Sequence, residues 1–142
     1  AALWPGCAPW VDGITDAGQL ARAAYRDAIP AAWSRGRVAL LGDAAHPMMQ
    51  YMAQGACMAM EDAVCLADSL SRYDSLESGL ATYKTRRVLR TARVQLMSRA
   101  MGDHVYHPAG PHAALRDVLM KAKSQDQWLD TLEWLYGGNG LD

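Results

Sequence analysis

The sequence predicts an α/β fold in which a single strand is accompanied by mostly helical structure. The strand is expected at residues 37–41, where the apolar letters VALL lead into Gly42 and Asp43. Five other segments have the composition or the periodicity of helices. Because one strand cannot form a stable sheet, we expect this chain to be the carboxyl-terminal part of a longer protein whose other strands lie upstream.

The amino-terminal elements lead into this strand. A helix is predicted at residues 17–28, with Asp16 as its N-cap and with Ile29 and Pro30 at its end. Residues 33–36 are expected to form a turn. The uninterrupted apolar run that follows is typical of a strand that is buried on both faces.

The second helix is predicted to begin at Gln54 or Gly55 and to end at Ser71, before a polar connection at residues 73–78. Apolar and small side chains recur in it at three- and four-residue steps, so the helix can lie close to a neighbour or to a ligand. The recurring positions are Ala56, Met60, Ala63, Ala67 and Leu70.

Three further helices are predicted in the carboxyl-terminal half. A long helix is expected at residues 77–101, with a break near Gly102. A turn-rich segment at residues 107–111 separates it from helices at residues 112–123 and 125–135. The long helix carries an apolar stripe, which consists of Leu80, Tyr83, Val88, Leu89, Val94, Leu96, Met97 and Met101.

The composition is that of an ordinary globular chain. Its 142 residues are 51% hydrophobic and 20% charged, with a net charge of -1. This balance argues against a general attraction to nucleic acid or to membranes, and no apolar run approaches the ~18 residues that span a bilayer. No secretory signal is expected at the amino terminus. Three cysteines do not make a disulfide framework, so we interpret Cys7, Cys57 and Cys65 as buried thiols in a reducing cytoplasm.

Asp43 is the centre of a candidate binding site. The predicted strand places its carboxylate at the strand's carboxyl end, and a turn of small residues follows. The helix that begins near Gly55 offers unpaired N–H groups and a partial positive charge at its amino terminus. Such an arrangement suits a ligand that combines hydroxyl groups with an anionic part.

The segment RVALLGDAAHPMMQYMAQGACMAMEDAVCLADSL, residues 37–70, resembles the second FAD-binding segment of the class A flavoprotein aromatic hydroxylases. Their pattern of GD, HP, a glycine-containing helix start and EDA is matched nearly position for position. The resemblance implies the carboxyl-terminal part of a glutathione-reductase-type, Rossmann-like FAD-binding monooxygenase fold. Residues 1–71 would end the FAD-binding domain, with the second FAD segment at 37–71, and residues 72–142 would form a carboxyl-terminal helical region.

The same resemblance assigns cofactor binding to Gly42, Asp43, Pro47, Gly55 and Ala56. Asp43 would accept a hydrogen bond from a ribityl hydroxyl of FAD, Pro47 would lie beside the isoalloxazine ring, and the backbone around Gly55 would face the pyrimidine edge of that ring. The physical chemistry agrees, because a helix amino terminus stabilises the negative charge of a reduced flavin. A glycine also lets the backbone approach the ring closely.

The loop after the turn is assigned to the aromatic substrate. There Gln50 would form a hydrogen bond with a phenol or a carboxylate, and Tyr51 would line an aromatic pocket. The letters QYMA are similar to hydroxylases of 3-hydroxybenzoate, whereas the overlapping MAQGACMA is similar to 6-hydroxynicotinate hydroxylases, and a salicylate-type enzyme is a further alternative. The whole enzyme would reduce FAD with NAD(P)H, capture O₂ as a flavin C4a-hydroperoxide and hydroxylate a phenolic aromatic acid.

The resemblance also indicates what this chain does not supply. The pyrophosphate site and the catalytic base are expected upstream, so the chain alone should be inactive. His46 is interpreted as a residue that orients the turn, and Glu61 and Asp62 as acids that pair with arginines. The three histidines His104, His107 and His112 do not have the spacing of a metal site.

The remaining features allow a reading from another class, a non-catalytic helical interaction module. The long helix is basic, and its charges are interpreted as a solvated face, a dimer contact or the partner of an acidic upstream surface rather than a nucleic-acid helix. These residues are Lys84, Arg86, Arg87, Arg90, Arg93 and Arg99. The aromatic ending at residues 128–137 must bury against something, either the core or a homodimer interface through the carboxyl-terminal helices.

Overall fold

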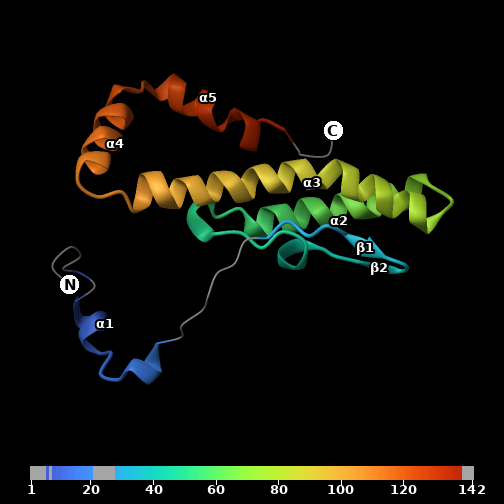
Figure 1. Ribbon diagram of the computed structural model, residues 1–142, viewed down its shortest axis with the longest axis horizontal. Coiled ribbons are helices and arrows are strands. Elements are labelled where there is room, and N and C mark those ends of the chain that lie inside the picture. Colours follow the sequence, from blue (N-terminus) through green and yellow to red (C-terminus); the bar gives the residue numbers. More distant parts are fainter. Residues whose placement is uncertain (1–5, 7, 21–27, 139–142) are drawn as a thin grey trace.

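The computed structural model describes residues 6, 8–20 and 28–138. Two long antiparallel helices dominate it (Figure 1), α2 at Gly55–Arg72 and α3 at Leu76–Met101. A small hairpin of β1, Ser34–Arg35, and β2, Val38–Ala39, lies beside α2, and α4 and α5 turn back over α3. None of the described helices is both long enough and apolar enough to cross a membrane.

The two long helices begin and end close to the predicted positions. The side chain of Ser75 caps α3 by accepting a hydrogen bond of 3.0 Å from the backbone N–H of Ser78. The missing side chain of Gly79 lets the two helices approach at their connection, because a Cβ there would lie 3.1 Å from the carbonyl oxygen of Ser69. The predicted domain boundary after residue 71 falls at the last residue of α2, and that division stays a prediction.

The face of α2 that packs against α3 is not the predicted one. Its buried residues are spaced by three and four positions, and they are Met58, Asp62, Cys65 and Ser69. Met60, by contrast, is 62% exposed. The apolar periodicity of α2 misled the prediction because the buried face contains a carboxylate, which is held by ion pairs to α3 rather than by apolar packing.

The predicted stripe of α3 is only partly buried. Leu80, Tyr83 and Val94 lie in the interior, whereas Leu89 and Leu96 are 79% and 62% exposed. One core cluster consists of Trp33, Ala45, Cys65 and Tyr83. A second consists of Met58, Val94 and Leu135. The positions between these clusters on α3 are occupied by polar side chains, which explains why an apolar stripe could not locate the contact.

The strand prediction was wrong in extent and in burial. Only Val38–Ala39 is strand, paired antiparallel with Ser34–Arg35 across a turn in which Gly36 has a φ of +59°. A glycine at that position suits a tight hairpin turn. Val38 is 67% exposed and Leu41 is 40% exposed. Leu40 packs against the cluster around Trp33, but in the part of the chain that the structure describes no other strand covers Val38 and Leu41, so the segment is not buried on both faces.

The amino-terminal helix prediction is contradicted where it can be compared. Ala17–Gln19 forms a single 3₁₀ turn, η2, and residue 28 is not helical. Residues 21–27 lie outside the described part. Asp16 does cap the turn, since its carboxylate accepts a hydrogen bond of 2.8 Å from the backbone N–H of Gly18. A short helix, α1 at Ala8–Asp12, precedes it.

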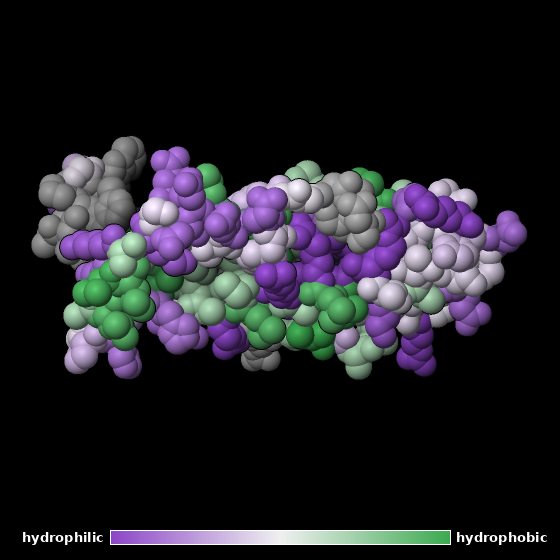
Figure 2. Space-filling view, turned by 90° about the horizontal axis from the view of Figure 1, so that it is seen from above, coloured by the Kyte–Doolittle hydropathy of each residue, from purple (hydrophilic) through white to green (hydrophobic). Residues whose placement is uncertain are grey.

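The carboxyl-terminal helices confirm the prediction. A π-helical turn, η5 at Gly102–Tyr106, ends α3, followed by α4 at Pro111–Ala122 and α5 at Gln125–Tyr136. A capping box between Ser124 and Gln127 starts α5. Figure 2 shows a hydrophobic patch at the end of the molecule where α4 lies. Its exposed side chains include Leu115, Val118 and Leu119.

Candidate functional site

Gly42 fixes the turn that carries Asp43. Its φ of +57° is in the left-handed region, and a Cβ there would lie 3.3 Å from the Cβ of Ala59 on α2. Both the backbone conformation and the space therefore favour glycine. The turn continues as η3, Gly42–Ala44, and packs directly on α2.

The turn brings two of the predicted cofactor residues together. Asp43 is exposed while Gly42, Ala45 and His46 around it are buried. Its carboxylate lies at the beginning of α2, since a Cβ placed on Gly55 would be 3.8 Å from Oδ1 of Asp43. The acid and the helix amino terminus predicted from the sequence are thus adjacent in space.

The beginning of α2 has no side-chain cap. Gln54 precedes the helix, and its side chain makes no capping hydrogen bond. Its amide group donates instead to the carbonyl oxygen of Met52, at 3.2 Å, and to the hydroxyl of Tyr136, at 3.1 Å. The first turn contains no acidic residue, and Ala56 within it is exposed. The partial positive charge of the helix start therefore faces the side on which Asp43 lies.

The loop between the turn and α2 is attached to α3. The side-chain amide of Gln95 donates to the carbonyl oxygen of Pro47 at 2.8 Å. The hydroxyl of Ser98 donates to the carbonyl oxygen of Met49 at 2.5 Å. Pro47 is half-buried. These contacts fix the backbone immediately after the turn that carries Asp43.

The two predicted substrate residues lie in a short 3₁₀ turn, η4 at Gln50–Met52. Gln50 is exposed and Tyr51 is half-buried. The hydroxyl of Tyr51 shares a hydrogen bond of 2.8 Å with Nε2 of His107. The Tyr51 ring also lies against the ring of Tyr106, with 5.3 Å between their centroids. The assignment of both residues to the aromatic substrate stays a prediction.

Asp62 joins the Asp43 turn to both long helices. It is wholly buried and accepts three hydrogen bonds, from the backbone N–H of Gly42 at 3.1 Å, from Nε2 of His46 at 2.5 Å and from Nε of Arg87 at 2.7 Å. The interpretation of His46 as the residue that orients the turn is confirmed. Asp62 therefore holds both ends of the turn and anchors them to α3.

Glu61 extends this network along α3. It accepts hydrogen bonds of 2.7 Å from Nη1 of Arg87 and of 2.8 Å and 2.7 Å from Nε and Nη2 of Arg90. Burial raises the pKa of Glu61, but the hydrogen bonds from the two arginines outweigh it, so the pKa lies below its ordinary value. The expected pairing of this acid with arginines is confirmed.

The electrostatics of Asp62 follow the same pattern. Burial raises its pKa, and the hydrogen bonds from His46, Arg87 and the Gly42 amide outweigh that effect. The net pKa lies below the ordinary value, so Asp62 is a carboxylate at neutral pH. A buried carboxylate of this kind is stable only while its partners remain in place.

The arginines of this network belong to the basic run of α3, for which the sequence suggested other roles. Arg86 pairs with Asp68 at 2.6 Å, and Arg87 and Arg90 pair with Glu61 and Asp62. Arg87 is wholly buried. These arginines bind acids of the preceding helix, and Arg87 is not part of a solvated face. The sequence predicted that Glu61 and Asp62 pair with arginines, but it did not identify Arg87 and Arg90 as those arginines.

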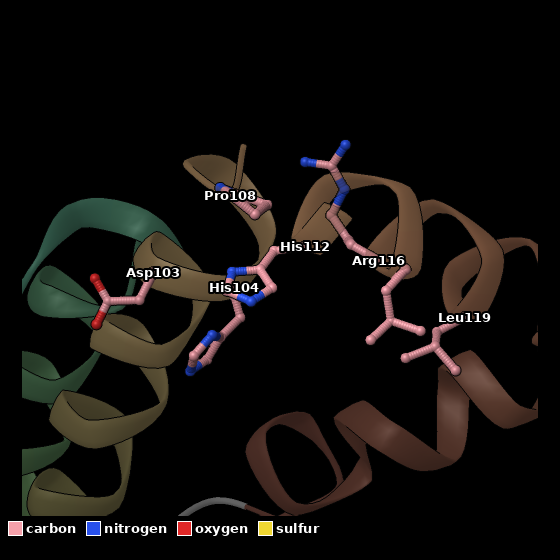
Figure 3. A pocket seen from close by; sticks show the side chains of 7 residues that line it. Asp103, His104, Pro108, His112, Arg116 and Leu119 are labelled. Carbon is pink, nitrogen blue, oxygen red and sulfur yellow. The ribbon is translucent and has the colours of Figure 1, made fainter. Parts of the chain in front are cut away.

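A second group of polar residues surrounds a pocket of about 310 Å³ between η5 and α4 (Figure 3). His104 and His112 line it, and Asp103 points away from them. The guanidinium of Arg116 is held by the carboxylate of Asp117 at 2.6 Å and by the carbonyl oxygen of Val105 at 2.8 Å. Among the described residues, no three acids, histidines or cysteines form a group that could hold a metal ion.

The comparisons with known proteins identify the class to which this site belongs. The family described as FAD binding domain matches residues 9–98, which include the Asp43 turn, α2 and most of α3. The chain belongs to this family. The predicted FAD-binding class and its cofactor are confirmed at this level.

Individual relatives are aromatic hydroxylases by name. The chain is 54% identical to 3-hydroxybenzoate 6-hydroxylase 1 of Aquipseudomonas alcaligenes, over 79% of this chain and 28% of that protein. It is 50% identical to 3-hydroxybenzoate 6-hydroxylase of Polaromonas naphthalenivorans, over 75% of this chain and 27% of that protein. It is 44% identical to a 3-amino-4-hydroxybenzoate 2-monooxygenase of Streptomyces platensis, over 74% of this chain and 26% of that protein. The chain thus spans about a quarter of the length of these relatives.

Proposed function

We propose that this chain supplies the ribityl and flavin-ring side of the FAD site in a monooxygenase that hydroxylates a phenolic aromatic acid. The observation that carries the proposal is the exposed Asp43 carboxylate at the beginning of α2, on a turn that buried Asp62 holds in place. The names of the relatives support an enzyme over a non-catalytic helical module.

The residues present fit this cofactor. The ribityl chain of FAD carries hydroxyl donors, which a carboxylate such as Asp43 accepts. The flavin ring carries acceptors and gains negative charge on reduction, which the open start of α2 at Gly55 stabilises. When bound, FAD supplies the redox chemistry that links NAD(P)H to O₂.

Each residue of the site has a separate role in this proposal. Asp43 holds the ribityl chain, and Gly42 sets the turn that presents it. Pro47, Gly55 and Ala56 shape the ring site and keep it free of bulky side chains. These roles concern binding and orientation, while the base that activates the substrate is expected in residues outside this chain.

The proposed substrate is a hydroxybenzoate, and 3-hydroxybenzoate is the preferred candidate. Gln50 offers an exposed amide that can donate to a carboxylate or accept from a phenol, and Tyr51 offers a ring for stacking. Salicylate and 6-hydroxynicotinate are the alternative substrates. We place the protein in the cytoplasm, which the free thiols of Cys57 and Cys65 support.

We further propose a homodimer that forms through the carboxyl-terminal helices. The exposed apolar side chains of α4 support this arrangement, because an unassociated surface rarely presents a large contiguous apolar patch. Light scattering of the purified full-length protein should give twice the mass of one chain, and a monomer at micromolar concentration would contradict the proposal.

Replacing Asp43 by alanine should weaken FAD retention. A hydrogen bond to a charged group contributes roughly 1.5–3 kcal/mol, so the dissociation constant of FAD should rise about 10- to 150-fold. The measurement is titration of the apoprotein, expressed from its full reading frame, with FAD. The control is Asp74→Ala, an exposed acid in the connection between α2 and α3. Equal FAD affinity in the two variants would remove Asp43 from the site.

Replacing Gln50 by alanine should affect the aromatic acid rather than the flavin. Loss of a hydrogen bond to the bound substrate should lower kcat/KM about 10- to 100-fold. FAD content should match the wild type, and less product should form per NADH consumed. The control is Gln125→Ala, at the exposed start of α5. If the two variants have the same kcat/KM and form the same amount of product per NADH consumed, Gln50 does not contact the substrate.

A further inference from the structure

The loop at residues 48–54 is held from two distant parts of the chain. Tyr51 shares its hydrogen bond of 2.8 Å with His107, which lies 56 positions further along. Gln54 donates to Tyr136 at 3.1 Å, across 82 positions. This loop connects the Asp43 turn to α2, so both contacts act on the proposed substrate side of the site.

The His107 contact depends on the end of α3. There the helix widens into the π-helical turn η5, which is followed directly by His107. Gly102 begins η5, and a Cβ there would overlap Cε2 of the Tyr51 ring and lie 2.7 Å from Cδ2. The ring of Tyr51 thus occupies the place of a side chain that Gly102 lacks. It also meets the ring of His107 edge-on, at 5.3 Å between centroids.

The Tyr136 contact depends on how α5 ends. Leu135 is 4% exposed and packs in the cluster with Met58 and Val94. The guanidinium of Arg90 donates to the last carbonyl oxygens of α5, those of Trp134 and Leu135, at 3.1 Å each. These contacts hold the helix end against α2 and α3, and the Tyr136 side chain, which is 65% exposed, meets Gln54 from there.

We propose that the region beyond α3 is a two-point clasp, formed by His107 and Tyr136, that positions the loop at residues 48–54 for the aromatic substrate. Both are positioning residues, because they act through Tyr51 and Gln54 rather than on the substrate itself. The inference rests on the proposed function for its substrate. The clasp lies outside the matched family segment, which ends at residue 98.

The experiment uses the protein expressed from its full reading frame and the variants His107→Leu, Tyr136→Phe and the double variant. Hydrogen exchange of the backbone amides at residues 48–54 should accelerate about two- to tenfold in each single variant and more in the double variant, since one hydrogen bond is lost at each point. Exchange in the interior of α2 should not change. The controls are His112→Leu on α4 and Tyr73→Phe in the helix connection, which keep the same chemical changes away from the loop.

A second readout separates positioning from general stability. With 3-hydroxybenzoate as the probe, KM should rise about two- to tenfold in each single variant while kcat changes less. His107→Gln should restore most of the loss, because its amide nitrogen can occupy the position of Nε2. Unchanged exchange at residues 48–54 in both variants would overturn the clasp. Faster exchange in a protein that hydroxylates none of the three proposed substrates would retain the clasp and reject the proposed function.

Discussion

Replacing Arg87 by methionine should produce a large loss of stability. Arg87 and Asp62 are both wholly buried, and their contact of 2.7 Å is the link between α3 and the Asp43 turn. Methionine has a similar length but carries no charge. Asp62 would therefore remain a buried carboxylate without the cationic hydrogen-bond donor that Arg87 provides. Breaking a buried ion pair from one side costs about 3–5 kcal/mol. Urea unfolding of the full-length protein, followed by circular dichroism, should show a loss of this size.

The matched control is Arg72→Met. Arg72 also donates through Nε to an aspartate, Asp68, at 2.8 Å, but its side chain is 67% exposed. An exposed ion pair contributes about 0–1 kcal/mol, so this variant should remain close to the wild type. FAD retention should fall in Arg87→Met and not in Arg72→Met, because Asp62, unlike Asp68, accepts hydrogen bonds from the turn that carries Asp43. Equal losses in the two variants would show that burial of the Asp62 network does not determine stability.

The parts of the fold that were predictable are those with a local cause. The limits of α2 and α3 follow from Gly55, from the polar connection and from the cap at Ser75. The adjacency of Asp43 and Gly55 was expected from a tight turn followed by a helix start, and both are present. Each of these signals involves residues that are close along the chain, which is why a single sequence contains them.

The parts that were not predictable depend on contacts between distant residues. The buried face of α2 carries Asp62, and hydrophobic periodicity cannot recognise a face that is stabilised by ion pairs. The run of basic residues on α3 did not show which arginines pair with Asp62 and Glu61, because these partners of Arg87 lie 25 and 26 positions earlier. His107 and Tyr136 gave no local pattern for the same reason.

The short strand shows a third limit. Four consecutive apolar residues are typical of a strand between two covered faces. In the described residues the chain provides only a two-residue partner, Ser34–Arg35, so Val38 remains exposed. The pattern describes the environment that these residues require, and the described part of the chain does not provide it.

Replacing Gly102 by alanine should displace Tyr51 and lower activity. In a helical position alanine is ordinarily about 1 kcal/mol more favourable than glycine. Here the added Cβ would overlap the Tyr51 ring. This ring cannot move freely, because its hydroxyl shares a hydrogen bond with His107 and its face lies against Tyr106. Overpacking of this kind costs about 1–3 kcal/mol. A displaced residue at a substrate site can reduce the rate about 100-fold, so kcat/KM for 3-hydroxybenzoate should fall roughly 10- to 100-fold.

A double-mutant cycle isolates the overlap. In a Tyr51→Ala background the ring is absent, and Gly102→Ala should then be neutral or stabilising by up to about 1 kcal/mol, as helix propensity alone requires. Thermal unfolding of the four proteins measures the coupling between the two positions without depending on activity. If Gly102→Ala lowers the stability equally in both backgrounds, the cause is not the Tyr51 ring. Gly102 would then be required by the π-helical turn itself, and the fixed position of Tyr51 would need another explanation.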